Sequence, residues 1–492
     1  MTTIKTKAKD GTPVEFVYKD PMQGGVKDVY FAPDKSYVVA FFRKNPDIAG
    51  QERIEKLVGQ YRKGIFEQAG GEYWKKLFCW PEKIVEYDGK IGMTVPAYQS
   101  HFFFGKQTSL AGAEKEGKWF ASAKNFNRFV PAEEKGTLLS YLRICLLLSR
   151  AVRRLHAAGL AHSDLSYKNC LVDPSGGNAC IIDIDGLVVP GLYPPDVVGT
   201  PDFIAPEVVS TLHLPVGDPN RKLPKRETDQ HALSVLVYMY LFHRHPLRGR
   251  KVHDQEPDIQ ERLEMGEKAL FIEHPQDKSN RPNLRENDKV CLPWVDINKT
   301  PYTMYGPLLK GLFELAFITG LHAPAQRPMA GDWETALVKT CDMLQPCQNS
   351  QCVKKWFVFD NTTKPTCPYC GTPYKGVLPV LDFYSTRNGK DYKPDNHRLM
   401  VYNNQYLYQW HVDRTVFPDE KLKPEHSKPV GYFAFHQGKW IFINQTLPAM
   451  KNLSTGEVVP VGKSVDLTEG LQLLLSPEAT GRIVNVKIVK ND

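Results

Sequence analysis

HSDLSYKNCLVD, residues 162–173, is followed by the apolar run and turn IIDIDGL at 181–187 and by GTPDFIAPEVV at 199–209. In the first of these segments, Asp164 and Asn169 are separated by four residues in a polar loop that leads into apolar residues. An Asp or Asn in a loop often only caps a turn, because its side chain can bond to the backbone nearby. Turn capping is therefore one interpretation of both residues.

In this order the three segments resemble the protein-kinase superfamily. The spacing of Asp164 and Asn169 is that of the kinase catalytic loop, and the apolar strand leading to Asp183 is that of its metal-binding turn. APE at 205–207 matches the end of the kinase activation segment. The resemblance extends over about residues 10–340 and implies a bilobal α+β fold.

Further landmarks of the large kinase lobe follow in the expected order. Asp229 begins an apolar helix, and Arg327 stands in QRP. The resemblance implies a structural ion pair between Arg327 and Glu207. Thr200 is a residue type that serine/threonine kinases favour, although Ser166 stands where they usually carry a lysine. The activation-segment motif favours a protein kinase over a small-molecule kinase, which shares the Asp-x4-Asn spacing.

The resemblance assigns phosphoryl transfer to three residues. This chemistry depends on positioning and charge neutralisation more than on covalent catalysis. Asp164 is implied as the catalytic carboxylate that accepts or orients the substrate hydroxyl proton. Asn169 and Asp183 are implied as ligands of Mg2+ on the phosphates of ATP.

Two positions depart from the kinase pattern. Ser163 replaces an arginine that often grips a phosphorylated activation loop, so activation by that route is not expected. Asp185 replaces the glycine of the metal-binding turn. Its carboxylate could add a metal ligand or face solvent, and we expect it to face solvent.

The nucleotide-binding loop is PMQGGVKDVYF at 21–31. Gly24 and Gly25 keep the middle of the kinase glycine loop and are expected to contact the nucleotide. Met22 and Lys27 replace its first and third glycines.

The following strand, VAFF at 39–42, lacks the expected lysine. Ala40 keeps the alanine of the kinase Val-Ala-x-Lys motif and is expected to contact the nucleotide, but Phe42 stands in place of the lysine. Arg43 has the wrong parity to replace it, because side chains alternate along a strand. Lys44 has the right parity but lies two residues too far along.

With-no-lysine kinases place their phosphate-binding lysine at the third glycine of the loop, the position of Lys27. The hypothesis is therefore that Lys27 is the catalytic lysine, paired with Glu55 or Glu52 on the adjacent helix. The alternative is a solvated loop lysine on a pseudokinase.

Four cysteines indicate a metal site. Cys347 and Cys352 form one pair, Cys367 and Cys370 a second, and fourteen residues separate the pairs. Paired cysteine knuckles close a tetrahedral thiolate site for Zn2+, and four protein ligands leave no open position, so the zinc is expected to be structural. Two disulfides or free buried thiols are the alternatives.

The pattern of apolar residues divides the chain into four segments. Residues 1–98 contain short strands (VEFVYK, KDVYFA, SYVVAFF, KIVEYD and KIGMTVPAY) and one helix at about 47–68. Long apolar helices at 137–159 and 231–242 dominate the next segment. The predicted domains are a kinase N-lobe at 1–98, a kinase C-lobe at 99–342, a zinc ribbon at 343–376 and a β-sandwich docking domain at 377–492.

The last segment resembles the second half of a forkhead-associated β-sandwich. Its phosphothreonine-binding residues cannot be placed, so a degenerate docking domain is expected. The positions expected in its core and turns are Trp440, Asn444, Gly462, Leu467, Gly470 and Leu473.

Composition limits the function classes. A chain of 492 residues with 42% hydrophobic and 24% charged residues is expected to form several soluble domains. The formal net charge of +8 comes without a dense basic run, so nucleic acid is not an expected partner. An apolar run of about 18 residues and a secretory signal are not found, which argues against a membrane span and a secreted protein. The ten cysteines do not form the pattern of a disulfide scaffold, which favours a reducing cytoplasm.

The leading interpretation is a cytoplasmic serine/threonine protein kinase that uses ATP, Mg2+ and structural Zn2+. The domain order is most similar to bacterial kinase-like proteins of tellurite-resistance and stress operons. That resemblance implies a von Willebrand A-domain protein and a metal-dependent protein phosphatase as partners. The alternative is a pseudokinase scaffold that binds nucleotide and partner proteins without phosphoryl transfer.

Overall fold

The computed structural model describes residues 2–19, 21–23, 26–68, 70–106, 108–189, 192, 199–215, 217–359 and 365–491. The chain forms two compact units. The first consists of Met1–Gly136, Ser140–Tyr302 and Gly311–Glu334. The second consists of Thr137–Leu139, Thr303–Lys310 and Thr335–Asp492.

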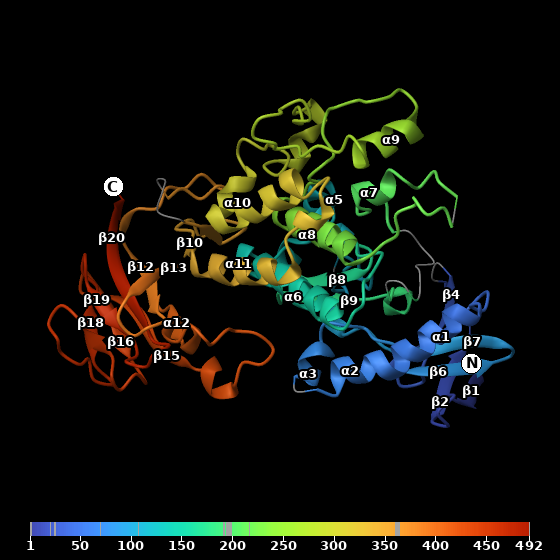
Figure 1. Cartoon of the computed structure of the whole chain (residues 1–492), viewed down its shortest axis with the longest axis horizontal. Helices are drawn as coiled ribbons and strands as arrows, with labels where there is room; N and C mark the ends of the chain where they lie inside the picture. Colours follow the sequence, from blue (N-terminus) through green and yellow to red (C-terminus); the bar gives the residue numbers. More distant parts are fainter. Residues whose placement is uncertain are drawn as a thin grey trace. The chain divides into compact units, whose positions relative to one another are not determined.

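The first unit begins with an antiparallel sheet of strand order β3-β4-β5-β7-β6, drawn in blue in Figure 1. A hairpin of β1 and β2 precedes it. The predicted strands are confirmed, but β1 was not predicted, since only one of its six residues, Ile4, is strongly apolar. The bounds are β1 (Thr2–Lys7), β2 (Pro13–Tyr18), β3 (Met22–Gln23), β4 (Lys27–Phe31), β5 (Tyr37–Phe42), β6 (Lys83–Tyr87) and β7 (Lys90–Pro96).

One face of this sheet is a hydrophobic core. Tyr30, Val39 and Phe41 pack there in one cluster with Phe16 of β2 and with Val85. Each of the five side chains is at most 9% exposed. The β1–β2 hairpin therefore covers this face.

The opposite face carries the residues of the nucleotide pattern. In the register of β4 and β5, Lys27 lies opposite Phe42 and Val29 lies opposite Ala40. Residues directly opposite each other in an antiparallel pair project to the same face. Lys27, Ala40 and Phe42 therefore share one face of the sheet.

The predicted helix at 47–68 is confirmed as three consecutive segments. They are α1 (Ile48–Lys56), a π-helical turn η1 (Leu57–Tyr61) and α2 (Arg62–Phe66). Asp47 caps the start, because its side chain accepts a hydrogen bond from Gly50 N–H at 2.8 Å. Ile54, Leu57 and Ile65 are buried, as their helical spacing predicts.

The remainder of the first unit is mainly helical. The apolar segment 231–242 lies in α8 and is buried on all sides, as predicted. Gly159, two residues after the end of the long helix α6, adopts a positive φ of 77°, as expected for a helix stop. The α-helices described in residues 70–342, of which α6, α10 and α11 lie partly in the second unit, are α3 (Gly71–Trp74), α4 (Lys118–Ala121), α5 (Ala123–Arg128), α6 (Leu138–Ala157), α7 (Pro206–Val209), α8 (Arg226–Phe242), α9 (Pro257–Met265), α10 (Gly306–Glu314) and α11 (Ala330–Asp342). A two-stranded sheet of β8 (Cys170–Asp173) and β9 (Asn178–Ile181) flanks the predicted catalytic loop.

The second unit contains two larger antiparallel sheets, with strand orders β13-β12-β20-β19-β17 and β14-β15-β16-β18. Buried side chains from both sheets form one hydrophobic cluster. Of the residues expected in core and turns, Trp440, Asn444, Leu467 and Leu473 are buried, and Gly462 and Gly470 have positive φ. The bounds are β10 (Leu344–Pro346), β11 (Trp356–Val358), β12 (Gly376–Thr386), β13 (Tyr392–Met400), β14 (Tyr406–Tyr408), α12 (Gln409–Val412), β15 (Pro429–His436), β16 (Lys439–Asn444), β17 (Lys451–Asn452), β18 (Ser464–Asp466), β19 (Gln472–Leu474) and β20 (Arg482–Asn491).

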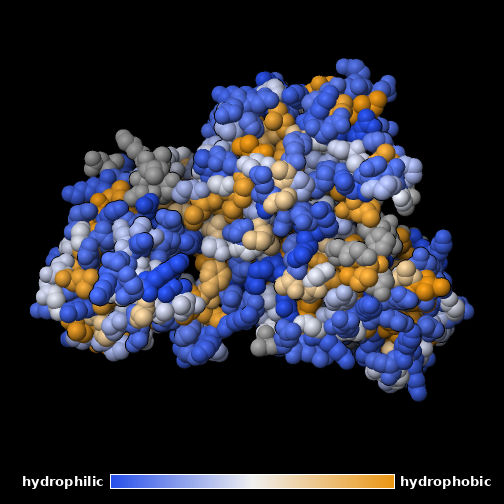
Figure 2. Space-filling view, in the orientation of Figure 1, coloured by the Kyte–Doolittle hydropathy of each residue, from blue (hydrophilic) through white to orange (hydrophobic). Residues whose placement is uncertain are grey.

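On the face drawn in Figure 2, hydrophilic residues predominate and hydrophobic residues occur in small scattered groups. Within the described ranges, no helix combines the length and the apolar character needed to cross a membrane.

Candidate active site and cysteine cluster

The loop before β8 fixes the carboxylate of Asp164 from two sides. Asn169 Nδ2 donates to Asp164 O at 2.8 Å and to Asp164 Oδ2 at 2.9 Å. The backbone N–H of Thr200 donates to Asp164 Oδ1 at 2.5 Å. Because Thr200 is 36 residues further along the chain, Asp164 does more than cap a local turn. The structure thus brings Asp164 and Asn169, two of the predicted site residues, together.

Asp229, the landmark at the start of α8, holds this loop in place. Its buried carboxylate accepts hydrogen bonds from His162 N–H at 2.7 Å and from Ser163 N–H at 3.2 Å. His156 Nε2 lies 3.1 Å from the same carboxylate. Ser163 has a positive φ of 63°, which is uncommon for residues other than glycine. These backbone bonds stabilise that conformation.

The predicted metal-binding turn lies next to the predicted catalytic loop. Ile182 N–H donates to Asn169 O at 3.0 Å, so the residue before Asp183 is bonded to the loop. Asp183 has a positive φ of 60° and begins the 3-10 turn η4 (Ile184–Gly186). The side chain of Asp183 is 57% exposed, so its carboxylate is accessible to a ligand.

Lys27 reaches this turn from β4. Its Nζ lies 2.6 Å from a carboxylate oxygen of Asp185 and 3.5 Å from Asp183 Oδ1. It also lies 5.3 Å from the ring centroid of Phe42, within the range of a cation–π contact. Phe42, which stands where the kinase pattern has the strand lysine, is therefore in contact with the ammonium of Lys27.

Two expectations about this turn are wrong. Asp185 does not face solvent, because its side chain is 15% exposed and pairs with Lys27. Lys27 does not pair with Glu55, which instead bonds Lys9 on the surface. Glu52 is likewise on the exposed side of α1. Neighbouring residues on a turn can converge on a partner that is distant in sequence, and local pattern alone does not reveal this.

The charges of Lys27 and Asp185 stabilise each other. Burial acts to lower the pKa of Lys27, but the negative charges of Asp185 and Asp183 outweigh it, and the pKa is raised. Burial acts to raise the pKa of Asp185, but the charge and hydrogen bond of Lys27, aided by Arg53, lower it. Lys27 and Asp185 therefore form an ion pair of two charged groups.

The structure describes only part of the predicted nucleotide site. Gly24 and Gly25 lie outside the described residues. Ala40 is buried in β5 and shares a sheet face with Lys27 and Phe42.

The predicted ion pair between Glu207 and Arg327 is confirmed. Arg327 Nη1 and Nη2 donate to Glu207 Oε1 and Oε2 at 2.8 and 2.7 Å. Arg327 also donates to the backbone oxygens of Gly320, Glu227 and Leu321. The pair ties α7 to the start of α8 and to the segment before α11.

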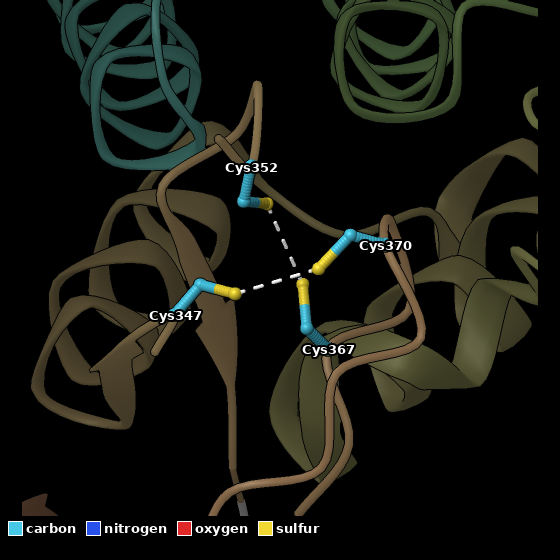
Figure 3. A group of neighbouring side chains, drawn as sticks. All are labelled: Cys347, Cys352, Cys367 and Cys370. Atoms are coloured by element: carbon cyan, nitrogen blue, oxygen red, sulfur yellow. Dashed lines mark hydrogen bonds between the residues drawn. The ribbon is translucent and has the colours of Figure 1, made fainter. Parts of the chain in front are cut away.

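The four cysteines of the predicted ribbon converge in the second unit, and Figure 3 shows their sulfur atoms pointing toward one another. Cys347 Sγ lies 3.5 Å from Cys370 Sγ, and Cys352 Sγ lies 3.7 Å from Cys367 Sγ. A disulfide requires about 2.05 Å, so the thiols are not joined. Zn–S bonds of about 2.3 Å in a tetrahedron place sulfur atoms about 3.8 Å apart, and the cluster fits that geometry.

The thiols of the cluster differ in pKa. Burial acts to raise the pKa of the Cys370 thiol, but hydrogen bonds with Thr372 and with neighbouring thiols lower it to about 6. Burial raises the pKa of Cys347 to about 11.

A second cluster of side chains was not predicted. Asp342 Oδ2 lies 2.6 Å from His397 Nε2 and 3.2 Å from His411 Nε2. Tyr408 N–H donates to His411 Nδ1 at 3.0 Å, which leaves the proton of a neutral His411 ring on Nε2, facing Asp342. Although burial opposes it, the two histidines hold the pKa of Asp342 well below its usual range. These three residues have no characteristic sequence spacing, so the pattern gave no signal for them.

Comparison with known proteins agrees with part of the sequence interpretation. Residues 124–294 match the family described as "Protein kinase domain". The chain is 33% identical over 102 residues to the "Death-associated protein kinase dapk-1" of Caenorhabditis elegans, covering 20% of this chain and 6% of that protein. It is 29% identical over 161 residues to the "Calcium-dependent protein kinase 4" of Arabidopsis thaliana, covering 29% of each. The chain thus spans less than a third of the length of either relative.

A solved structure is also similar. The kinase domain of a Toxoplasma gondii specific rhoptry antigen aligns with 12% sequence identity and a TM-score of 0.39, covering 69% of this chain and 86% of that one.

The match at 124–294 shows that the chain contains a protein kinase domain. Asp164, Asn169 and Asp183 lie inside the matched range, whereas Lys27 and Arg327 lie outside it.

Proposed function

We propose that this chain is a serine/threonine protein kinase that transfers the γ-phosphate of ATP to protein partners. The observation that carries this proposal is the position of Lys27. Its ammonium lies against Phe42 and 3.5 Å from Asp183, so it occupies the region that a lysine at position 42 would occupy. Lys27 would then supply both the position and the positive charge of the missing strand lysine.

Three further residues complete the proposed catalytic set. Asp164 orients the hydroxyl of the protein substrate, because its carboxylate is fixed by Asn169 and Thr200. Asn169 and Asp183 are proposed to hold Mg2+, which supplies neutralisation of the phosphate charge when bound. Their oxygens suit a hard cation, and the exposed carboxylate of Asp183 is accessible to one.

Serine/threonine and protein specificity are supported at the activation segment. Thr200 donates its N–H to Asp164, and its Oγ1 lies 3.2 Å from Ser166 Oγ. The segment that would border a protein substrate is thereby bonded to the catalytic loop. The two named relatives, each matched over only part of its length, are both protein kinases, which is consistent with this specificity.

The other parts of the chain are proposed to serve folding and docking. Cys347, Cys352, Cys367 and Cys370 would bind one structural Zn2+ and form a zinc ribbon. The two C-terminal sheets would form a degenerate forkhead-associated-like sandwich that docks partners. By the resemblance to bacterial stress-operon proteins, these partners are a von Willebrand A-domain protein and a metal-dependent protein phosphatase, in the cytoplasm.

Phosphate transfer from radiolabelled ATP and Mg2+ to these partners tests the proposal. We expect Asp164→Asn to lower kcat by about 10²- to 10⁴-fold, since a positioned proton acceptor is lost. We expect Lys27→Met to lower it by about 10²- to 10³-fold, since a charge aimed at the phosphates is lost.

Lys44→Met is the matched control, because Lys44 is an exposed lysine close in sequence to Phe42. It should transfer phosphate like the wild type. Equal activity of Lys27→Met and Lys44→Met would contradict the role of Lys27. Nucleotide binding by the wild type without transfer under any condition would replace the kinase proposal with the pseudokinase scaffold.

A further inference from the structure

In α1, the helix beside the nucleotide-binding sheet, the buried charged side chain is a cation, whereas a kinase has a carboxylate on this helix. In protein kinases a glutamate on this helix forms an ion pair with the phosphate-binding lysine. Here the buried charged residue of α1 is Arg53, which is 6% exposed. Glu52 and Glu55 of the same helix are exposed. A buried arginine repels an ammonium, so the carboxylate that holds Lys27 must come from elsewhere.

The structure supplies this carboxylate from the metal-binding turn. Lys27 and Asp185 are 2.6 Å apart, and their side chains are 13% and 15% exposed. The positive charge of Arg53 acts on the same carboxylate. The acidic partner of Lys27 is therefore Asp185 of the metal-binding turn rather than a residue of α1.

We propose that Asp185 is the positioning residue of Lys27 and takes over the task of the helix glutamate. The proposal rests on the proposed function, in which Lys27 binds the phosphates. Asp183 and Asp185 belong to the same short turn, so one piece of backbone places both the metal ligand and the anchor of the lysine. The Asp at position 185, where other kinases have glycine, is then a compensation for the arginine on α1.

A consequence follows for Mg2+. The second carboxylate near Lys27 is that of Asp183, at 3.5 Å, and Asp183 is the proposed metal ligand. Without Asp185, Lys27 has Asp183 as its nearest described acidic partner. The ammonium then competes with Mg2+ for Asp183, and binding of Mg2+–ATP weakens.

The experiment measures the Kd of Mg2+–ATP and the thermal melting temperature of the wild type and six variants of the full chain. We expect Asp185→Asn to raise the Kd on the order of tenfold. Asp185→Gly restores the residue that other kinases have at this turn and removes the carboxylate, so it should show the same loss. Asp185→Glu should bind within about threefold of the wild type, because it keeps the charge. In Lys27→Met, adding Asp185→Asn should cause no further loss.

Glu55→Gln is the matched control, because Glu55 is a carboxylate of α1 that pairs with Lys9 instead. It should bind Mg2+–ATP like the wild type. A Kd unchanged by Asp185→Asn and Asp185→Gly would overturn the proposal. So would a loss of the same size with and without Lys27, since Asp185 would then act independently of the lysine. If Asp185→Asn lowers the melting temperature, the Kd values of Asp185→Glu and Asp185→Gly test the proposal in its place.

The two proposals can fail separately. A wild type that binds Mg2+–ATP and transfers no phosphate overturns the proposed function alone, because the Kd comparison still tests Asp185. A wild type that binds no nucleotide overturns both.

Discussion

At the scale of single residues, the ion pair of Glu207 and Arg327 is the most consequential contact outside the proposed catalytic set. Arg327 is buried, and its guanidinium is bonded to both carboxylate oxygens and to three backbone oxygens. Removing one partner of such a pair leaves a buried charge without compensation, which is costly. We expect Glu207→Gln to lower the free energy of unfolding of the first unit by about 3 kcal/mol in urea denaturation.

An exposed pair of the same unit is the control for this measurement. Lys5 and Glu15 lie 3.1 Å apart with side chains 75% and 42% exposed. Exposed pairs contribute at most about 1 kcal/mol, so Lys5→Met should change the free energy of unfolding little. Equal losses in the two variants would show that the burial of Arg327 has no special effect.

His397 makes the stability of the second unit depend on pH. Burial lowers the pKa of His397 below its usual value of 6.5; Asp342 opposes the shift, and His411 and Arg482 add to it. The folded state therefore favours neutral His397, so its contribution is fully present above pH 6.5 and is lost as the pH falls below that value. We expect the melting temperature of the wild type to fall more between pH 7.5 and 5.5 than that of His397→Gln.

Glutamine is suitable here because its amide can still donate to Asp342 but does not titrate. His436→Gln, a change at an exposed histidine of the same unit, should follow the wild type across this pH range. The prediction would be refuted by parallel melting curves of the wild type and His397→Gln.

At the scale of elements, regular hydrophobic patterns predicted the structure well. The helix at 47–68 is observed over Ile48–Phe66, and the apolar segment 231–242 is a buried helix. The π-helical turn at 57–61 was not predicted, because one wider turn hardly disturbs the apolar spacing. β1 was not predicted because it is a strand through its pairing with β2 and has few apolar residues of its own.

The conformation of the proposed catalytic loop was predictable for a different reason. Asp164 and Asn169 are five positions apart, so their hydrogen bond follows from a local loop conformation. The Lys27–Asp185 contact joins residues 158 positions apart, and nothing in the sequence around Asp185 indicates it. The sequence did contain one signal that α1 buries a charge. Arg53 lies at helical spacing from the buried residues Gly50 and Leu57, so this spacing places its side chain on the buried side of the helix.

At the scale of the whole molecule, the cysteine cluster and the C-terminal sheets share a hydrophobic core. Cys352, Cys367 and Phe357 belong to the same buried cluster as Leu378 of β12 and Met400 of β13. The predicted boundary between the ribbon and the β-domain, at 376, therefore passes through a packed region of the second unit. We infer that a metal bound by the cysteines stabilises the adjoining sheet as well as the ribbon.

This inference gives a prediction for metal removal. We expect one Zn2+ per chain by elemental analysis, absent from Cys367→Ser, because three thiolates cannot close the tetrahedral site. We also expect Cys367→Ser to lower the melting temperature of the second unit on the order of 10 °C, because metal binding contributes directly to folding and the core is shared. Cys341→Ser is the control, since Cys341 lies in α11 outside the cluster, and it should keep both the zinc and the melting temperature. If Cys367→Ser loses the zinc while the sheets melt as in the wild type, the shared core does not couple them, and the ribbon folds independently of the strands that follow it.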